Sequence, residues 1–150
     1  MTHQADGPRD RDRDPRAQEA PAAIPAAIPA AITAVNLEAD DPRSLAAFWS
    51  AALGGTVISA GEQLYVRPAQ PGGVGMFIQP LAGPRPSRNL THVDLTVAWE
   101  DRAALVERLV GLGATHRWDV LFEHPGVRWT TLADPEGNLF CVAEHRPDHD

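Results

Sequence analysis

The sequence predicts an α+β domain built from two copies of one module, each with a strand, a helix and three further strands. The first observation is an internal repeat, because Val35–Leu37 matches Val93–Leu95 at an offset of 58 residues and Leu53–Gly54 matches Leu112–Gly113 at an offset of 59. The second is the alternation of apolar and polar residues that predicts short strands, interrupted in each copy by one helical segment. The domain is expected over residues 33–145, as modules of about 33–80 and 91–145.

The first strand of each module is predicted to have one apolar and one polar face. In the second copy, Val93 and Leu95 alternate with His92 and Asp94, and Asn36 occupies the matching polar position of the first copy. The apolar face is expected to meet the helix. The polar face is therefore the predicted location of a binding site.

Each helix has its own boundary signals. The first is expected to start at Asp40 or Asp41 as N-cap, with Pro42 as the first helical residue, and to end at Gly54. The second is expected to run from about Glu100 to residues 111–113. The remaining strands are predicted near residues 56–60, 63–67, 74–79, 115–121, 127–133 and 139–144.

A hairpin turn is predicted before the last strand, where Asp134 and Pro135 precede Glu136 and Gly137. Gly137 is expected to need a left-handed backbone, and Glu136 is expected to be exposed. In the strand that follows, Cys141 points away from the face shared by its two neighbours.

The composition limits the classes of partner. Residues 1–32 combine alternating Arg and Asp with a Pro-Ala-Ala-Ile repeat, which predicts a disordered tail, and residues 146–150 form a second short tail. The chain has a formal net charge of −7, so no nucleic-acid partner is expected. No signal peptide and no membrane span are predicted. The single cysteine fits a reducing compartment, and a cytoplasmic location is expected.

The duplicated βαβββ plan resembles the vicinal oxygen chelate superfamily, and within it the small glyoxalase-like domains of bacteria. Three segments carry the resemblance: residues 41–49 at the start of the first helix, Leu112–Ala114 after the second, and Asp134–Asn138 before the last strand. The resemblance implies facing curved mixed sheets around a cavity, which holds a divalent metal in the enzymes and a metal-free ligand in the drug-binding members.

The resemblance also implies four positions for metal ligands, which fall on Ala34, about Gln79, His92 and Cys141. Of these, His92 alone is the usual ligand. Ala34 cannot coordinate a metal, Gln79 offers a neutral amide, and a soft thiol replaces a hard carboxylate at Cys141. We therefore expect no metal cofactor.

The candidate ligand-binding residues each allow a simpler interpretation. His92 either binds a ligand group or carries protons, or it is only hydrogen-bonded to a neighbour. Cys141 is either part of the site or a small buried filler. Trp129 and Phe77 either form the walls for a flat ligand or pack in the core. The predicted ligand-binding set is His92, Asp94, Gln79, Cys141, Trp129, Phe77 and Asn36, and no catalytic residue is assigned.

Three functional classes follow from these residues. The first is a metal-free cavity protein that binds a small organic molecule. The second is an enzyme of the same superfamily, a lyase, isomerase or dioxygenase-like protein, which uses a divalent metal or His92 as acid or base. The third is an accessory domain whose cavity has lost its role. A homodimer is a possible assembly.

Overall fold

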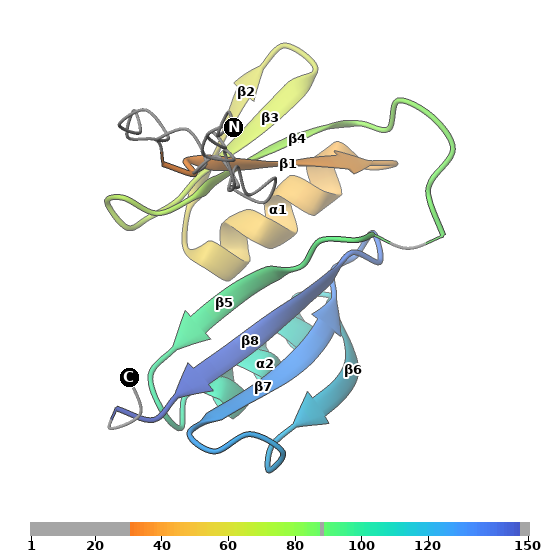
Figure 1. The fold of residues 1–150 in the computed structure, drawn as a ribbon. Coiled ribbons are helices and arrows are strands. Elements are labelled where there is room, and N and C mark those ends of the chain that lie inside the picture. Colours follow the sequence, from red (N-terminus) through yellow and green to blue (C-terminus); the bar gives the residue numbers. More distant parts are fainter. Residues whose placement is uncertain (1–30, 88, 148–150) are drawn as a thin grey trace, which may run out of the picture. The chain divides into compact units, whose positions relative to one another are not determined.

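The computed structural model describes residues 31–87 and 89–147. The predicted tail of residues 1–32 therefore lies outside the described residues, apart from its last two, as do residues 148–150 of the second tail. The described chain forms a strand, a helix and three strands, twice in succession (Figure 1). The elements are β1 (Ala34–Ala39), α1 (Pro42–Leu53), β2 (Thr56–Ala60), β3 (Gln63–Arg67), β4 (Gly75–Pro80), β5 (Val93–Val97), α2 (Arg102–Gly111), β6 (Thr115–Val120), β7 (Val127–Ala133) and β8 (Leu139–His145).

The strands form two four-stranded mixed sheets, which confirms the predicted α+β class. Their strand orders are β1-β4-β3-β2 and β5-β8-β7-β6. In each sheet the first strand of the module runs parallel to the last, and the other pairs are antiparallel. The two sheets therefore have the same topology, as a duplicated sequence predicts.

Helix α1 begins and ends where the sequence predicts. The carboxylate of Asp41 accepts the N–H of Ser44 at 3.1 Å, and Pro42 follows as the first helical residue. Gly54 closes the helix with φ of 64°, a left-handed conformation that glycine adopts without steric cost. The buried face of the helix includes Phe48 and Trp49, whose rings lie with centroids 5.3 Å apart in an edge-on arrangement.

Helix α2 begins at Arg102, later than predicted. Glu100 has φ of 80°, which is incompatible with a right-handed helix, so the helical backbone starts only after it. Asp101 occupies the N-cap position but makes no side-chain capping bond. No described helix has the length and hydrophobicity needed to cross a membrane.

Strand β6 forms an edge of the second sheet and contains an irregularity. Its pairing with β7 shifts between His116 and Trp118, so Arg117 is an extra residue at a β-bulge. The strand is exposed along most of its length. The bulge is therefore accommodated where the strand has a partner on one side only.

The turn between β7 and β8 is the predicted hairpin, and it also joins the two modules. Asp134 is 3% exposed and accepts the backbone N–H groups of Glu136 and Asn138, both at 3.0 Å. The other oxygen of its carboxylate accepts the indole N–H of Trp49 in α1 at 3.2 Å. Gly137 has the expected left-handed backbone, with φ of 86°. The buried carboxylate of Asp134 thus connects the turn to Trp49, a buried residue of the helix in the other module.

The expectation that Glu136 is exposed is wrong. Its side chain is 11% exposed, because the carboxylate accepts the backbone N–H of Asp41 at 2.8 Å and pairs with Arg85 in the segment between the modules. Arg85 also pairs with Asp40 at 3.2 Å. These partners are 51 and 95 residues away from Glu136 in sequence, so a local turn pattern does not reveal them.

Candidate functional site

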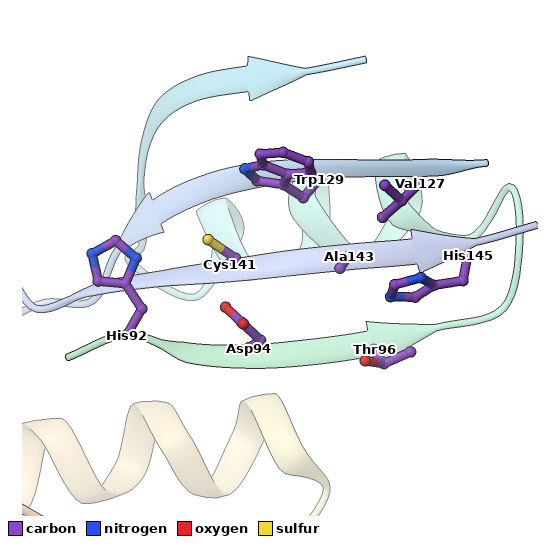
Figure 2. Close-up of a pocket in the computed structure, with 8 residues that line it drawn as sticks. All are labelled: His92, Asp94, Thr96, Val127, Trp129, Cys141, Ala143 and His145. Atoms are coloured by element: carbon purple, nitrogen blue, oxygen red, sulfur yellow. The ribbon is translucent and has the colours of Figure 1, made fainter. Parts of the chain in front are cut away.

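A pocket of about 450 Å³ lies on the face of the second sheet that is opposite its apolar, helix-facing residues (Figure 2). We call it the sheet pocket. Its walls come from three adjacent strands, β5, β7 and β8, together with the residue that precedes β5. The lining residues are His92, Asp94, Thr96, Val127, Trp129, Cys141, Ala143 and His145.

The register of the strands brings these side chains together. Asp94 pairs with Cys141 across the parallel β5–β8 ladder, and Trp129 pairs with Ala143 across the antiparallel β7–β8 ladder. Because successive side chains on a strand point to opposite faces, the lining residues of each strand stand at every second position. Residues far apart in sequence, such as Asp94 and Cys141, therefore become neighbours.

The structure brings four of the predicted site residues together. His92, Asp94, Trp129 and Cys141 all line the sheet pocket, and Figure 2 shows their side chains on one side of the sheet. Sequence reasoning did not include Thr96, Val127, Ala143 and His145, which also line it. These four residues stand at every second position from His92, Trp129 or Cys141 on the same strands. The alternation of side chains along a strand could therefore have predicted all of them.

The other three predicted residues lie on the first sheet and do not line this pocket. Asn36 on β1 pairs with Phe77 on β4, and Gln79 is two residues further along β4. The ring of Phe77 lies against Tyr65, with centroids 4.7 Å apart. The amide oxygen of Gln79 accepts a hydrogen bond from the Gln63 amide at 3.0 Å. These residues form an amide and aromatic face of their own.

The thiol of Cys141 is in an environment that keeps it protonated. Its residue is 9% exposed, and its sulfur lies 3.4 Å from the hydroxyl oxygen of Thr131. Burial is the largest effect and raises the pKa of the thiol, the hydrogen bond with Thr131 lowers it in part, and the nearby carboxylate of Asp94 raises it. A protonated thiol is a poor nucleophile and a poor metal ligand.

The imidazole of His92 is available for a ligand. It is an exposed side chain at one end of the lining set, as Figure 2 shows. Within residues 31–87 and 89–147, no side-chain hydrogen bond engages its ring. The alternative interpretation, that His92 is only hydrogen-bonded to a neighbouring side chain, therefore finds no such bond among the described residues.

The side chains present do not fit the divalent metal that the superfamily resemblance implies. Of the four positions carried over, Ala34 has no ligand atom, the oxygen of Gln79 already accepts a hydrogen bond from Gln63, and Cys141 offers a soft thiol whose pKa is raised by burial. In the part of the chain that the structure describes, no three His, Cys, Asp or Glu side chains form a group that could hold a metal ion. His92 lacks the partners that a metal centre requires.

An aromatic stack supports one wall of the pocket. The rings of His124 and Trp129 lie nearly parallel, with centroids 5.2 Å apart and an interplanar angle of 26°. His124 belongs to the loop between β6 and β7, so the sequence did not indicate this contact. The stack limits the orientations that the Trp129 indole can take.

The opposite face of the same strands contains a buried charged cluster. Glu144 on β8 is 2% exposed, and it accepts the backbone N–H of Glu100 at 2.6 Å. Its carboxylate also lies 3.4 Å from Arg102 Nε and 3.1 Å from Arg128 Nε. The positive φ of Glu100 thus directs a backbone donor at a buried carboxylate. Glu144 shares the face of Phe140 and Val142, so the period of two could have indicated its burial, which the sequence analysis did not predict.

Comparison with known proteins identifies the family and the fold. The sequence model of the family described as a glyoxalase-like domain matches residues 34–143. A search of curated proteins gives no match.

Similar solved structures include a glyoxalase/bleomycin resistance protein/dioxygenase family enzyme from Burkholderia phytofirmans PsJN, with 19% identity, TM-score 0.65, and coverage of 77% of this chain and 99% of that one. A glyoxalase-related enzyme from Fulvimarina pelagi has 21% identity, TM-score 0.62, and coverage of 77% and 88%. The fosfomycin resistance protein FosX from Listeria monocytogenes has 14% identity, TM-score 0.63, and coverage of 82% and 98%.

These similar structures share the fold of the described chain, and the matched family segment covers most of both modules. The duplicated βαβββ topology and the turn before the last strand are the features on which the superfamily resemblance was based. The chain belongs to the glyoxalase-like domain family, in agreement with its resemblance to the vicinal oxygen chelate superfamily.

Proposed function

We propose that this protein binds a small organic molecule in the sheet pocket and does so without a metal ion. The observation that carries the proposal is the composition of the pocket wall. Trp129, Val127 and Ala143 provide apolar surface, and polar side chains stand beside them on β5. Small-molecule sites are typically apolar cavities of about 300–1,000 Å³ with a few polar groups. The volume of about 450 Å³ lies in that range.

The polar groups define what the ligand would present. His92, Asp94 and Thr96 follow one another at every second position along one edge of the pocket. The imidazole donates or accepts a hydrogen bond, the carboxylate accepts, and the hydroxyl does both. The Trp129 indole offers a flat surface on the other side. A ligand with a flat or aromatic body and a hydrogen-bond donor directed at Asp94 fits this arrangement.

A second candidate function is acid–base catalysis by His92. The observation that favours it is the absence of a hydrogen-bond partner for the ring among the described residues, since a catalytic imidazole must be free to exchange a proton with a substrate. Two of the similar structures are of proteins described as enzymes. A turnover assay on any ligand that the pocket retains separates this function from binding alone.

Two further expectations remain proposals. A homodimer would cover the amide and aromatic face formed by Asn36, Phe77 and Gln79, whose side chains are exposed or half-buried. Analytical ultracentrifugation of the full chain tests this assembly. A cytoplasmic location fits the single protonated thiol and is tested by cell fractionation.

A thermal-shift screen tests the binding proposal. Aromatic organic compounds, and separately Mn²⁺, Ni²⁺ and Zn²⁺, are added to the wild type and to the His92→Ala variant. His116→Ala serves as the matched control, because His116 is also exposed but does not line the pocket.

We expect an organic compound to raise the melting temperature of the wild type and of the control. His92→Ala should weaken its binding by about 1–3 kcal/mol, because a polar group of the bound ligand is left unpaired. Stabilisation by a metal ion alone, lost in the His92→Ala variant, would contradict the proposal and favour a metal-dependent enzyme.

A further inference from the structure

A second pocket of about 280 Å³ lies at the end of the second sheet where β7 begins and β8 ends. We call it the arginine pocket. It shares no lining residue with the sheet pocket. Its lining includes two arginines and a histidine but no Asp or Glu: the residues are Trp99, Leu121, Phe122, His124, Pro125, Gly126, Arg128 and Arg146. In a chain with a net charge of −7, a cavity lined only by basic, apolar and aromatic side chains is unusual.

The two arginines meet at one indole. The guanidinium carbon of Arg128 is 3.9 Å from the centroid of the Trp99 ring, and that of Arg146 is 4.9 Å from it. Each contact is a favourable cation–π interaction. Two like charges on one ring nevertheless repel each other, and a bound anion would remove that repulsion.

The neighbouring carboxylates leave this charge incompletely balanced. Glu144 lies 3.1 Å from Arg128 Nε, but this nitrogen is not in hydrogen-bond geometry with it, and the same carboxylate also serves Arg102. Arg146 has no carboxylate within salt-bridge distance among residues 31–87 and 89–147. Glu123, in the adjacent loop, accepts the backbone N–H groups of Leu121 and Phe122 and does not line the pocket.

The guanidinium groups retain unused hydrogen-bond donors. Within the described part of the chain, no side-chain hydrogen bond is donated by Arg128 or by Arg146. Arginine presents a planar set of N–H donors that matches the two oxygens of a carboxylate or phosphate. An acidic group placed between Arg128 and Arg146 would use these donors and neutralise the pair.

The rim of the pocket is apolar. Phe122 is 91% exposed and Leu121 is half-buried, and both line the same pocket as the two arginines. An exposed phenyl ring of this kind gains from contact with a flat apolar surface. The acidic group and the apolar surface together specify the class of ligand.

We propose that the arginine pocket is a second binding site, which takes an organic anion: a carboxylate or phosphate ester attached to a flat apolar group. Arg128 and Arg146 hold the acidic group, and Phe122 and Leu121 contact the apolar part. The site is separate from the sheet pocket, because residues that are adjacent in sequence, such as His145 and Arg146, enter different pockets. His124, which lines the arginine pocket, stacks on Trp129, which lines the sheet pocket.

Isothermal titration calorimetry of the full chain with phenyl phosphate and with benzoate tests this site, and phenol serves as the neutral probe. We expect saturable binding of at least one anion and none of phenol. Arg146→Gln should weaken the binding by at least about tenfold, because it removes one charged donor without disturbing a described ion pair. Arg146→Lys keeps the charge but loses the planar set of donors, so its affinity should be intermediate.

Arg117→Gln is the matched control, since it removes the same charge from an exposed residue of the same sheet that lies outside the pocket. Its affinity should equal that of the wild type, as should that of His92→Ala, which alters the sheet pocket. The proposal is overturned if neither anion binds saturably, if Arg117→Gln loses as much affinity as Arg146→Gln, or if His92→Ala abolishes the binding. The last result would assign the anion to the sheet pocket.

Discussion

The substitution Asp134→Ala is expected to destabilise the domain more than an ordinary turn substitution. The carboxylate of Asp134 is buried and accepts hydrogen bonds from the backbone of Glu136 and Asn138, from the Asn138 amide and from the Trp49 indole. The variant leaves all of these donors without their acceptor. The consequence depends on whether water can replace it.

The indole N–H of Trp49 cannot reach water, because this residue is 1% exposed. A buried donor left unsatisfied costs about 1–3 kcal/mol. The donors of Glu136 and Asn138 are half-buried, and losing a bond to a charged acceptor there costs about a further 1–2 kcal/mol in total. We therefore expect a loss of about 2–5 kcal/mol in the free energy of unfolding, and a fall in melting temperature of about 8–20 °C for a domain of this size.

Thermal and urea melts of four proteins measure the effect: the wild type, Asp134→Ala, Trp49→Phe and the double variant. Trp49→Phe removes the donor and keeps an aromatic ring beside Phe140, whose centroid is 5.0 Å from that of Trp49. Because the buried donor is then absent, Asp134→Ala should cost about 1–2 kcal/mol less in that background. Equal costs in the two backgrounds, or a loss below about 1 kcal/mol in the single variant, would refute the reasoning.

Three further outcomes are expected. Gly137→Val should cost about 1–2 kcal/mol in calorimetric melts, because Gly137 has φ of 86° although no neighbour would obstruct a side chain; an unchanged melting temperature would contradict this. Cys141 should react with a thiol reagent more slowly at pH 8 than it does in the urea-unfolded chain, because burial raises its pKa; equal rates would show an accessible thiolate. The hydrogen bond from the Thr130 hydroxyl lowers the pKa of Asp119 below 3.8. The ionised carboxylate therefore stabilises the folded state above pH 3.8, and this stabilisation is lost as the pH falls through the pKa of the folded state. Asp119→Asn should therefore reduce stability in urea melts at pH 7 and make no difference once the pH is below that value, whereas a constant difference would exclude the ionised carboxylate as the cause.

Local signals in the sequence were sufficient to predict where helix α1 and the turn before β8 begin and end. Asp41 and Pro42 mark the start of α1, Gly54 marks its end, and the turn at Asp134 carries the residues that its geometry requires. Each of these signals acts within a few residues, so it does not depend on the rest of the chain. The second helix was predicted less well, since the long-range bond from Glu100 to Glu144 decides where it begins.

The sequence predicted the faces of the strands but not which sheet surfaces form one pocket. The period of two placed His92, Asp94 and Cys141 on a polar face, and the structure has all three in the sheet pocket. Gln79 was assigned from the superfamily resemblance and Phe77 as an aromatic wall, and both lie on the first sheet, where they line no part of that pocket. Alternation within a strand carries no information about the relation of one sheet to another.

The bulge at Arg117 indicates where relatives of this chain can differ in length. An inserted or deleted residue within β8 would reverse the side of the sheet that every following side chain takes, so His145 and Arg146 would exchange places. Edge strand β6 already accommodates one extra residue without changing its pairing on either side. Insertions and deletions in the family are therefore expected to accumulate in β6 and the loop after it, while β7 and β8 keep a constant number of residues.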